Sequence, residues 1–442
     1  MAAPAKPQNR TATEILEGFR RDHAKDITLS LRPAYKDLLS KLGDPHLHLP
    51  PVFHVAGTNG KGSTCAFLRS ILEAAGYKVH VYTSPHLMRI HERIRVAGKL
   101  ISEDALKNLL LECEAASPPG ALSYFEASTA AAFAAFARTP ADFTLLETGL
   151  GGRLDATNVV PKPLATLITR LSFDHREYLG NTHDKIAREK AGIMRQNVPC
   201  FTMTQYESDS INALRDVALK VGAPLIAGGQ DWHITPKAKG FHFKYGEHIF
   251  DMPLPSLIGQ HQIENAGLAL AALTVLPKPP SQEIMAQGLQ KATWPARLQK
   301  IENGQLAELL PAQVELWLDG GHNDSAGSVL AEQAKLWRDQ DGHELHIILG
   351  MLTTKLPCEF LAPLRPYISS LCTVAIADEP QSFSSQDLAI EARACDIHNV
   401  VTADSLQEAI TLLSKANRRL LITGSLYLAG QVLRENGSDI EA

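Results

Sequence analysis

Three glycines and a lysine form the stretch of this chain best suited to chemistry on a phosphate. Gly57, Gly60 and Gly62 lie around Lys61, where a strand-forming segment gives way to a helical pattern. Glycine lets the backbone adopt positive φ and approach a ligand, and the amides of the turn and the helix N-terminus would face an anion beside the ammonium. The pattern predicts a phosphate-binding loop. The alternative is an ordinary glycine-rich turn between a strand and a helix.

This loop departs from the standard P-loop at two positions. Val55 stands where the standard loop has its first glycine, and Gly62 stands where it has the Ser or Thr that holds magnesium. A metal bound here would therefore need ligands from elsewhere in the chain.

Three side chains that follow or close predicted strands are candidates for that role. They are Ser84, Glu147 and His175. Ligands of open α/β sheets sit outside the carboxyl ends of the strands. A hydroxyl, a carboxylate and an imidazole beside a nucleotide suit magnesium, although an imidazole is unusual for so hard an ion. In the alternative interpretation Ser84 only shapes a turn before Pro85, Glu147 caps the following loop and His175 is a surface residue.

Strands and helices are predicted to alternate along the chain and so to position these residues. Apolar runs predict strands at 78–82, 143–147 and 165–169, with helical patterns between them. This alternation predicts an α/β fold with a mostly parallel sheet and helices on both faces. Composition shifts at 276–280 and 294–297, after which further strands are predicted at 316–318, 345–349, 372–376, 400–401 and 420–423. We expect two domains, 1–293 and a smaller Rossmann-like α/β domain at 297–442.

Composition excludes several classes of partner. The 442 residues carry a formal net charge of −5, which offers no basic surface for nucleic acid or a membrane. The N-terminus has no apolar core of a signal peptide, and the run 127–137 is too short to span a bilayer and predicts a packed helix. The six cysteines are dispersed without a Cys-x-x-Cys pair, which favours reduced thiols. We therefore expect a soluble, cytoplasmic protein.

Several motifs taken together resemble the folylpolyglutamate synthase family of ATP-dependent ligases, and most closely its bifunctional bacterial dihydrofolate synthase/folylpolyglutamate synthase members. The motifs are 57–63, 83–87, 147–155, 187–193 and 319–323, and the resemblance runs in order from about residue 11 to about residue 430. It implies a P-loop-type, Mur-ligase-like N-terminal domain that binds ATP and the pterin, and a C-terminal glutamate-ligase domain.

The resemblance also implies roles at the nucleotide. The phosphates would be held by Gly57, Thr58, Asn59, Gly60, Lys61, Gly62 and Ser63, and two magnesium ions by Ser84, Glu147 and His175. Further ATP contacts would come from Asn265, Arg297 and Asp319. Lys190 matches a lysine that the family carries as a carbamate. Without the resemblance, Lys190 would be interpreted as a solvated lysine, Arg297 as a linker charge and Asp319 as a helix N-cap.

The acceptor substrates are implied in the same way. The pterin would contact Thr28, Leu29, Ser30, Leu31, Ser123, Tyr124, Phe125, Glu126, Leu154, Asp155 and Ala156, and the incoming glutamate would contact His322 and Ser425. An aromatic pair beside a carboxylate suits a flat heterocycle with amide-like NH groups. Alternatively, Tyr124 and Phe125 anchor an alanine-rich helix. Three positions depart from the family pattern: Gly321 replaces an alanine, Ser30 a common glycine and Arg32 a common acidic residue.

The expected reaction is ATP-dependent ligation of L-glutamate to dihydropteroate and to reduced folates through an acyl phosphate. Lys190, Lys61 and His322 would be the catalytic residues, and the protein is expected to be a monomer that binds ATP and magnesium. The alternatives are a folylpolyglutamate synthase only, a Mur-type peptidoglycan-precursor ligase, or a nucleotide-binding switch without ligase chemistry. The segment before Gly57 is too short for the separate UDP-sugar-binding domain of Mur-type enzymes.

Overall fold

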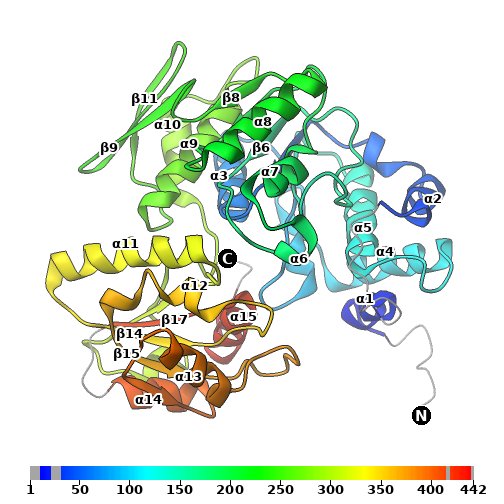
Figure 1. The fold of residues 1–442 in the computed structure, drawn as a ribbon. Coiled ribbons are helices and arrows are strands. Elements are labelled where there is room, and N and C mark those ends of the chain that lie inside the picture. Colours follow the sequence, from blue (N-terminus) through cyan, green and yellow to red (C-terminus); the bar gives the residue numbers. More distant parts are fainter. Residues whose placement is uncertain (1–9, 21–30, 415–418, 440–442) are drawn as a thin grey trace. The chain divides into compact units, whose positions relative to one another are not determined.

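The computed structural model describes residues 10–20, 31–414 and 419–439, and the chain divides into two compact units (Figure 1). The first unit comprises residues 1–255 and 263–292, and the second comprises 256–262 and 293–442. Within the described ranges, no helix is long and apolar enough to cross a membrane.

An eight-stranded sheet with the order β4-β3-β2-β5-β1-β6-β7-β8 forms the centre of the first unit. Its strands are β1 (Val52–Ala56), β2 (Val79–Tyr82), β3 (Ile94–Val96), β4 (Lys99–Leu100), β5 (Phe143–Glu147), β6 (Ala165–Ile168), β7 (Cys200–Thr202) and β8 (Leu225–Ala227). All neighbouring pairs are parallel except β2/β3 and β3/β4. Because β1, β2, β5 and β6 are buried along their whole length, their sequences are predominantly apolar, and this is why these four strands could be predicted.

Helices make up most of the rest of the first unit. They are α1 (Ala12–Arg20), α2 (Pro33–Lys41), α3 (Lys61–Ala74), α4 (Glu103–Ala116), α5 (Tyr124–Arg138), α6 (Arg176–Leu179), α7 (His183–Ala191), α8 (Ser208–Val221), α9 (Gln260–Leu273) and α10 (Gln282–Lys291), with short 3-10 segments η2 (Pro45–Leu47) and η3 (Ile90–Arg93). Of these helices, α3 and α5 pack directly against the sheet. The alanine-rich α5 is buried through most of its length and packs with α1, α4 and β2. The packed helix predicted at 127–137 is therefore confirmed.

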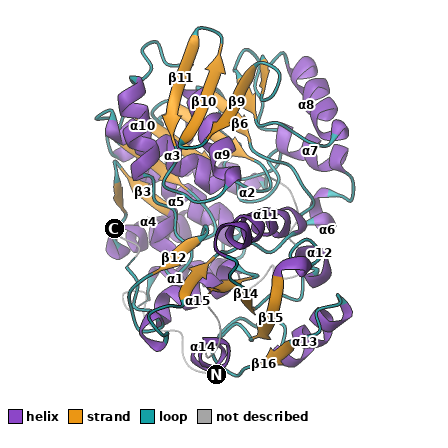
Figure 2. Ribbon diagram, turned by 90° about the vertical axis from the view of Figure 1, so that its left-hand side faces the viewer, coloured by secondary structure: helices purple, strands orange, loops and turns teal. Residues whose placement is uncertain are grey.

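A separate three-stranded antiparallel sheet also belongs to the first unit (Figure 2). It consists of β9 (Trp232–Lys237), β10 (Gly240–Tyr245) and β11 (His248–Pro253). Many of its side chains are exposed, and its buried apolar side chains are Trp232, Phe241, Phe243 and Met252. The apolar-run criterion does not predict this sheet, because each strand is buried on one face only.

The second unit contains a six-stranded sheet with the order β12-β13-β17-β14-β15-β16, parallel except for β12/β13. Its elements are β12 (Gln299–Ile301), η4 (Ala307–Leu309), β13 (Glu315–Leu318), α11 (Asp324–Asp341), β14 (Leu345–Leu349), α12 (Pro357–Leu361), η5 (Arg365–Tyr367), β15 (Ile368–Thr373), α13 (Ser385–Ala394), β16 (Val400–Thr402), α14 (Leu406–Ser414), β17 (Arg419–Thr423) and α15 (Leu426–Glu435). The strand expected at 372–376 instead begins at Ile368, because Ser369 and Ser370 interrupt the apolar pattern at its start.

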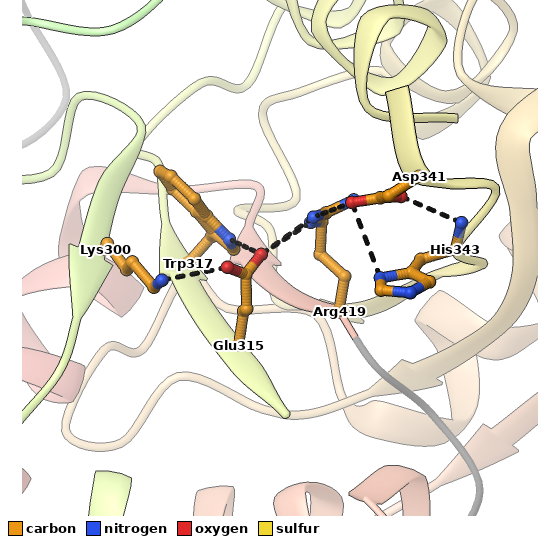
Figure 3. A network of polar contacts seen from close by, with 6 residues as sticks. All are labelled: Lys300, Glu315, Trp317, Asp341, His343 and Arg419. Atoms are coloured by element: carbon orange, nitrogen blue, oxygen red, sulfur yellow. Dashed lines mark hydrogen bonds and ion pairs between the residues drawn. The ribbon is translucent and has the colours of Figure 1, made fainter. Parts of the chain in front are cut away.

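A buried arginine connects two strands and a helix of this unit (Figure 3). Arg419 donates to Glu315 Oε2 from Nε at 3.0 Å and from Nη2 at 2.8 Å, and to Asp341 Oδ2 at 2.9 Å. Lys300 pairs with the other oxygen of Glu315 at 2.8 Å. The side chain of Arg419 is 5% exposed, so this network neutralises a charge within the fold.

One prediction about the cysteines is wrong. Cys358 in α12 and Cys395, which follows α13, form a disulfide across a sequence separation of 37 residues. Dispersion along the chain does not show which thiols meet once helices pack, and α12 contacts α13. Cys65, Cys113, Cys200 and Cys372 are free and buried.

Candidate active site

The glycine-rich loop leaves the central strand β1 and enters α3. Gly60 is the N-cap of α3, and its φ of 91° lies in the left-handed region that favours glycine. A Cβ at Gly60 would lie 2.3 Å from Asn265 Oδ1, and one at Gly57 would lie 1.8 Å from Thr169 Oγ1. Both positions therefore require glycine. Asn265, predicted as an ATP contact, lies against the loop at Gly60.

The end of β6 supports this loop from its other side. The amides of Thr58 and Asn59 donate to the Arg170 carbonyl at 3.0 and 3.3 Å. The Thr58 hydroxyl donates to the Ser172 carbonyl at 3.0 Å and accepts from the Ser172 amide at 3.2 Å. These contacts hold the loop in one conformation. Arg170 and Ser172 could not be predicted from the sequence, because nothing in their spacing indicates contact with a loop so far away in the chain.

The Arg170 side chain is itself held in place. Its guanidinium pairs with Glu264, donates to the Tyr206 hydroxyl at 3.1 Å and lies 4.2 Å from the centre of the Tyr206 ring. The Tyr206 hydroxyl donates to Glu264 at 3.0 Å. The residue whose carbonyl supports the loop is thus fixed by its own side chain.

Two lysines meet at one carbonyl of the loop. Lys61 Nζ donates to the Gly57 carbonyl at 3.1 Å and to that of Thr58 at 3.2 Å, and Lys190 Nζ donates to the Gly57 carbonyl at 2.7 Å. Lys190 is only 5% exposed, so its interpretation as a solvated lysine is wrong. Burial, and then the charge of Lys61, lowers the pKa of Lys190 to about 7. A large fraction of Lys190 is therefore an uncharged, nucleophilic amine at neutral pH.

Two of the three predicted metal ligands, Ser84 after β2 and Glu147 in β5, lie at strand ends, whereas His175 is the N-cap of α6. Glu147 is the last residue of β5 and is buried, and its Oε2 accepts from the Ser84 amide at 3.3 Å. His175 is exposed, has φ 49° and lies 3.8 Å from Asp174. No cluster of three or more His, Cys, Asp or Glu suited to a metal occurs in the described part of the chain. Ser84 and Glu147, which are in contact, offer the hard oxygen donors that magnesium prefers.

The candidate pterin residues gather around the start of α5. Ser123 and Glu126 form a capping box in which Glu126 Oε2 accepts from the Ser123 amide at 2.8 Å and from its hydroxyl at 2.9 Å. The guanidinium of Arg93 lies 5.3 Å from the centre of the Tyr124 ring. Phe125 packs against Gly149, where a Cβ would lie 2.5 Å from its ring. Both rings are half-buried at the edge of the core, so their side chains both anchor α5 and retain an exposed part.

The second glycine-dense loop supplies the remaining candidate pterin residues. Asp155 Oδ2 accepts from the amides of Gly149 and Leu150, both at 2.9 Å, and its Oδ1 accepts from the amide and hydroxyl of Thr157 at 2.9 and 2.6 Å. Burial raises the pKa of Asp155, and these hydrogen bonds oppose the rise. The carboxylate therefore holds the loop closed. Leu154 is half-buried, the carbonyl of Ala156 accepts from Tyr35, and Leu31 packs against the core. Thr28, Leu29 and Ser30 lie outside the described residues.

The candidate residues of the second unit converge where β13 and β17 end. Asp319 accepts from the amides of Leu298 and Gly321 at 2.9 and 2.7 Å. Burial raises its pKa, and the charge of Arg297 opposes the rise. Asp319 is not the N-cap of α11, because Asn323 fills that role by accepting from the Ala326 amide at 3.0 Å.

His322 and Ser425, predicted to bind glutamate, stand on adjacent loops of this unit. The Gly424 amide donates to the Gly321 carbonyl at 3.0 Å, which joins the two loops. The Ser425 hydroxyl caps α15, and His322 Nδ1 lies 3.0 Å from the Gly320 carbonyl. Arg297 is half-buried and donates to the Ala296 carbonyl at 3.1 Å.

Comparisons with known proteins agree with this architecture. Residues 55–273 match the Mur ligase middle domain, and residues 302–435 match the dihydrofolate synthetase C-terminal domain. A dihydrofolate synthase/folylpolyglutamate synthase of Bacillus subtilis is 35% identical over 426 residues, which is 90% of this chain and 93% of that protein.

Solved structures are similar over the whole chain. E. coli FolC in complex with DHPP and ADP has a TM-score of 0.85 and 31% identity, and the match covers 97% of this chain and 98% of that one. A bifunctional folylpolyglutamate synthase/dihydrofolate synthase with Mn, AMPPNP and L-glutamate bound has a TM-score of 0.83 and 29% identity, and the match covers 98% and 99%. The predicted α/β fold and the family resemblance are therefore confirmed, and the chain belongs to the folylpolyglutamate synthase/dihydrofolate synthase family.

Proposed function

We propose that this chain ligates L-glutamate to dihydropteroate and to folates, using ATP and Mg²⁺. Relatives that share this architecture are named for both activities, and their solved complexes contain a nucleotide, Mn, L-glutamate or DHPP. The observation in this chain that supports the proposal best is the placing of two lysines on the loop carbonyl of Gly57, one of them buried with its pKa lowered to about 7.

In the first step, the substrate carboxylate attacks the γ-phosphorus of ATP, and the bond to the β–γ bridging oxygen breaks. This gives an acyl phosphate and ADP. The amides at the start of α3 and the ammonium of Lys61 stabilise the charge on the transferring group. When bound, magnesium would neutralise phosphate charge, and Ser84, Glu147 and His175 are the residues proposed to hold two such ions. The α-amine of glutamate then attacks the acyl carbon, and phosphate leaves.

Lys190 is proposed to act as a carbamate. Its uncharged Nζ attacks CO₂ and releases one proton to solvent, so that the neutral amine becomes an anionic carbamate. A buried lysine of lowered pKa is suited to this reaction, because the protonated form has no lone pair to offer. The product would supply a carboxylate near the loop, which lacks the usual hydroxyl at Gly62.

The two units are proposed to divide the substrates. Residues 1–293 would bind the ATP phosphates and the pterin, with Asn265 at the adenine. In residues 297–442, Arg297 and Asp319 would contact ATP, and His322 and Ser425 would bind the incoming glutamate. The support for these last roles is that Asp319 accepts from the amide of Leu298, next to Arg297, and from the amide of Gly321, next to His322.

The decisive experiment is an ADP-release assay with dihydropteroate and with a reduced folate, each with and without L-glutamate. Both acceptors should give glutamate-dependent release, and Lys61→Ala should abolish it in a chain that keeps its thermal unfolding transition. Release with the reduced folate alone would make the protein a folylpolyglutamate synthase only. Release with a UDP-muramyl acceptor would favour a Mur-type ligase, and ATP binding without any release would favour a nucleotide-binding switch.

A further inference from the structure

Arg170, two residues after β6, contacts both the phosphate loop and α9. Its carbonyl accepts from the amides of Thr58 and Asn59 at 3.0 and 3.3 Å. Its guanidinium pairs with Glu264 in α9, and the next residue of that helix is Asn265, which lies against the loop. Arg170 is therefore bonded through its backbone to the loop and through its side chain to the helix that carries the proposed adenine contact.

The side chain of Gln205 holds the backbone on both sides of Arg170. Gln205 Oε1 accepts from the Leu171 amide at 3.0 Å, and its Nε2 donates to the Thr169 carbonyl at 3.1 Å. Because one partner is a donor and the other an acceptor, the orientation of the side-chain amide is determined. The same Nε2 donates to Thr202 Oγ1 at 3.1 Å, at the end of β7. The Arg170 carbonyl is thus held at a fixed position against the loop.

Tyr206, the next residue after Gln205, holds the side chain of Arg170. Its ring lies 4.2 Å from the guanidinium, and its hydroxyl accepts from Arg170 Nη2 at 3.1 Å. The same hydroxyl donates to Glu264 at 3.0 Å. Each of the three side chains therefore contacts the other two, and the loss of one weakens the hold on both that remain.

These contacts matter more for the position of the loop than for the stability of the fold. The side chains of Arg170 and Glu264 are 20% and 27% exposed, and Tyr206 is 67% exposed. Ion pairs with this much contact with solvent contribute little to the free energy of folding. The loop amides and Asn265, by contrast, would bind different ends of one nucleotide, so a change in their separation weakens binding at one end.

We propose that Arg170 is a positioning residue for the nucleotide. Held by Gln205 and Tyr206, it keeps the phosphate loop and Asn265 at the separation that one ATP molecule needs, and it does so without touching ATP itself. This inference rests on the nucleotide-binding part of the proposed function and deepens it, because it adds residues that set the affinity for ATP. The chemical step and the binding of glutamate do not depend on this separation.

The test measures ADP release as a function of ATP and of L-glutamate. Arg170→Met keeps the backbone carbonyl but removes the guanidinium, and it should raise the KM for ATP about tenfold, as expected when one hydrogen-bonded charge is lost. The kcat and the KM for L-glutamate should stay close to the wild-type values. Arg170→Lys keeps a charge opposite Glu264 and should recover most of the affinity. The matched control is Arg138→Met, which breaks the exposed pair with Glu112 in the same unit and should keep the wild-type KM for ATP.

Titration with a fluorescent ATP analogue, without acceptor or glutamate, measures binding apart from turnover, and unfolding curves report on the fold. Should Arg170→Met fail to fold, Tyr206→Phe replaces it; this variant keeps the ring, removes only the hydroxyl and should weaken ATP binding a few-fold.

A folded Arg170→Met that binds the analogue as tightly as wild type overturns this inference. Equal rises in KM for ATP and for glutamate, with a lower unfolding temperature, also overturn it, because they indicate a structural role only. In either case the proposed function stands if wild type releases ADP with dihydropteroate and glutamate. A wild type that releases no ADP, but loses affinity for the analogue in Arg170→Met, overturns the proposed ligase activity and supports the positioning role.

Discussion

Replacing Lys190 by methionine should stabilise this protein at neutral pH and destabilise it at high pH. The unfolded chain holds the Lys190 proton up to its ordinary pKa of 10.5, whereas the folded chain releases it above about 7. Between these values the unfolded state binds more protons, so this residue makes the free energy of unfolding rise with pH. Below about pH 7 both states are protonated, and the cost of a buried charge is present in full.

The size of the effect follows from the same two values. A difference of one in pKa corresponds to about 1.4 kcal/mol, so the change from 10.5 to about 7 costs the folded state about 5 kcal/mol. Methionine removes this cost and also the hydrogen bond to the Gly57 carbonyl, which contributes about 1 kcal/mol. The variant should be more stable by about 3 to 4 kcal/mol at pH 7 and less stable by about 1 kcal/mol above pH 10.

The assay is urea denaturation of both proteins between pH 6 and 10.5 in CO₂-free buffer. The two stability curves should cross within this range. Addition of bicarbonate should then raise the stability of wild type alone, since only Lys190 can be carboxylated at this position. If Lys190→Met is less stable at every pH by a constant amount, Lys190 is an ordinary structural residue and the pKa reasoning is wrong.

Three shorter predictions concern other parts of the chain. Glu147→Gln should raise the magnesium concentration needed for half-maximal turnover, and superimposable metal titrations would show that Glu147 is not a ligand. Arg419→Met should cost about 3 kcal/mol in urea denaturation at pH 7. Burial raises the pKa of Glu315, but hydrogen bonds from Lys300, Arg419 and Trp317 lower it to a net value below the ordinary one. The hydrogen bond from Arg419 also lowers the pKa of Asp341. The stabilisation from ionised Glu315 and Asp341 is present above the pKa values of these groups in the unfolded chain, and it is lost as the pH falls through their pKa values in the folded chain. The difference in free energy of unfolding between wild type and Arg419→Met should therefore shrink below about pH 4. A difference that stays constant with pH would contradict this explanation. Cys358→Ser should lower stability by up to about 4 kcal/mol, and a reducing agent should bring wild type to the same value; an unchanged wild type in reductant would contradict the disulfide's role.

The parts of the fold that could be predicted are those that the chain encodes locally. β1, β5 and β6 are predominantly apolar runs, and the glycines of the phosphate loop mark a turn whose backbone approaches its neighbours closely. The antiparallel sheet β9–β11 was missed because many of its side chains are exposed. The disulfide was missed because spacing along the chain does not reveal which helices pack.

In the candidate site, too, features encoded locally could be predicted and features that depend on tertiary packing could not. Sequence alone favoured a solvated Lys190, since its neighbours Arg188 and Glu189 are charged, whereas α7 turns Lys190 inward to a loop far away in the chain. Arg32 could be identified as unusual from the sequence, but its pairing with Glu126 depends on how α5 packs. Burial and pairing of charges are properties of the tertiary structure, and single-residue patterns carry little information about them.

The shared carbonyl of Gly57 has a consequence for the order in which small molecules load onto this protein. The charge of Lys61 is one cause of the lowered pKa of Lys190. An anion that binds beside Lys61 compensates that charge, and Lys190 then holds its proton more tightly. By the reciprocity of linkage, phosphate and proton favour each other here, whereas phosphate and CO₂ oppose each other. In a chain that meets ATP before CO₂, more of Lys190 is protonated, and its carboxylation is therefore slower. We expect a lag in turnover when CO₂-free protein is mixed with nucleotide first, and no lag when bicarbonate is added first; identical time courses in the two orders would show that the two lysines do not communicate.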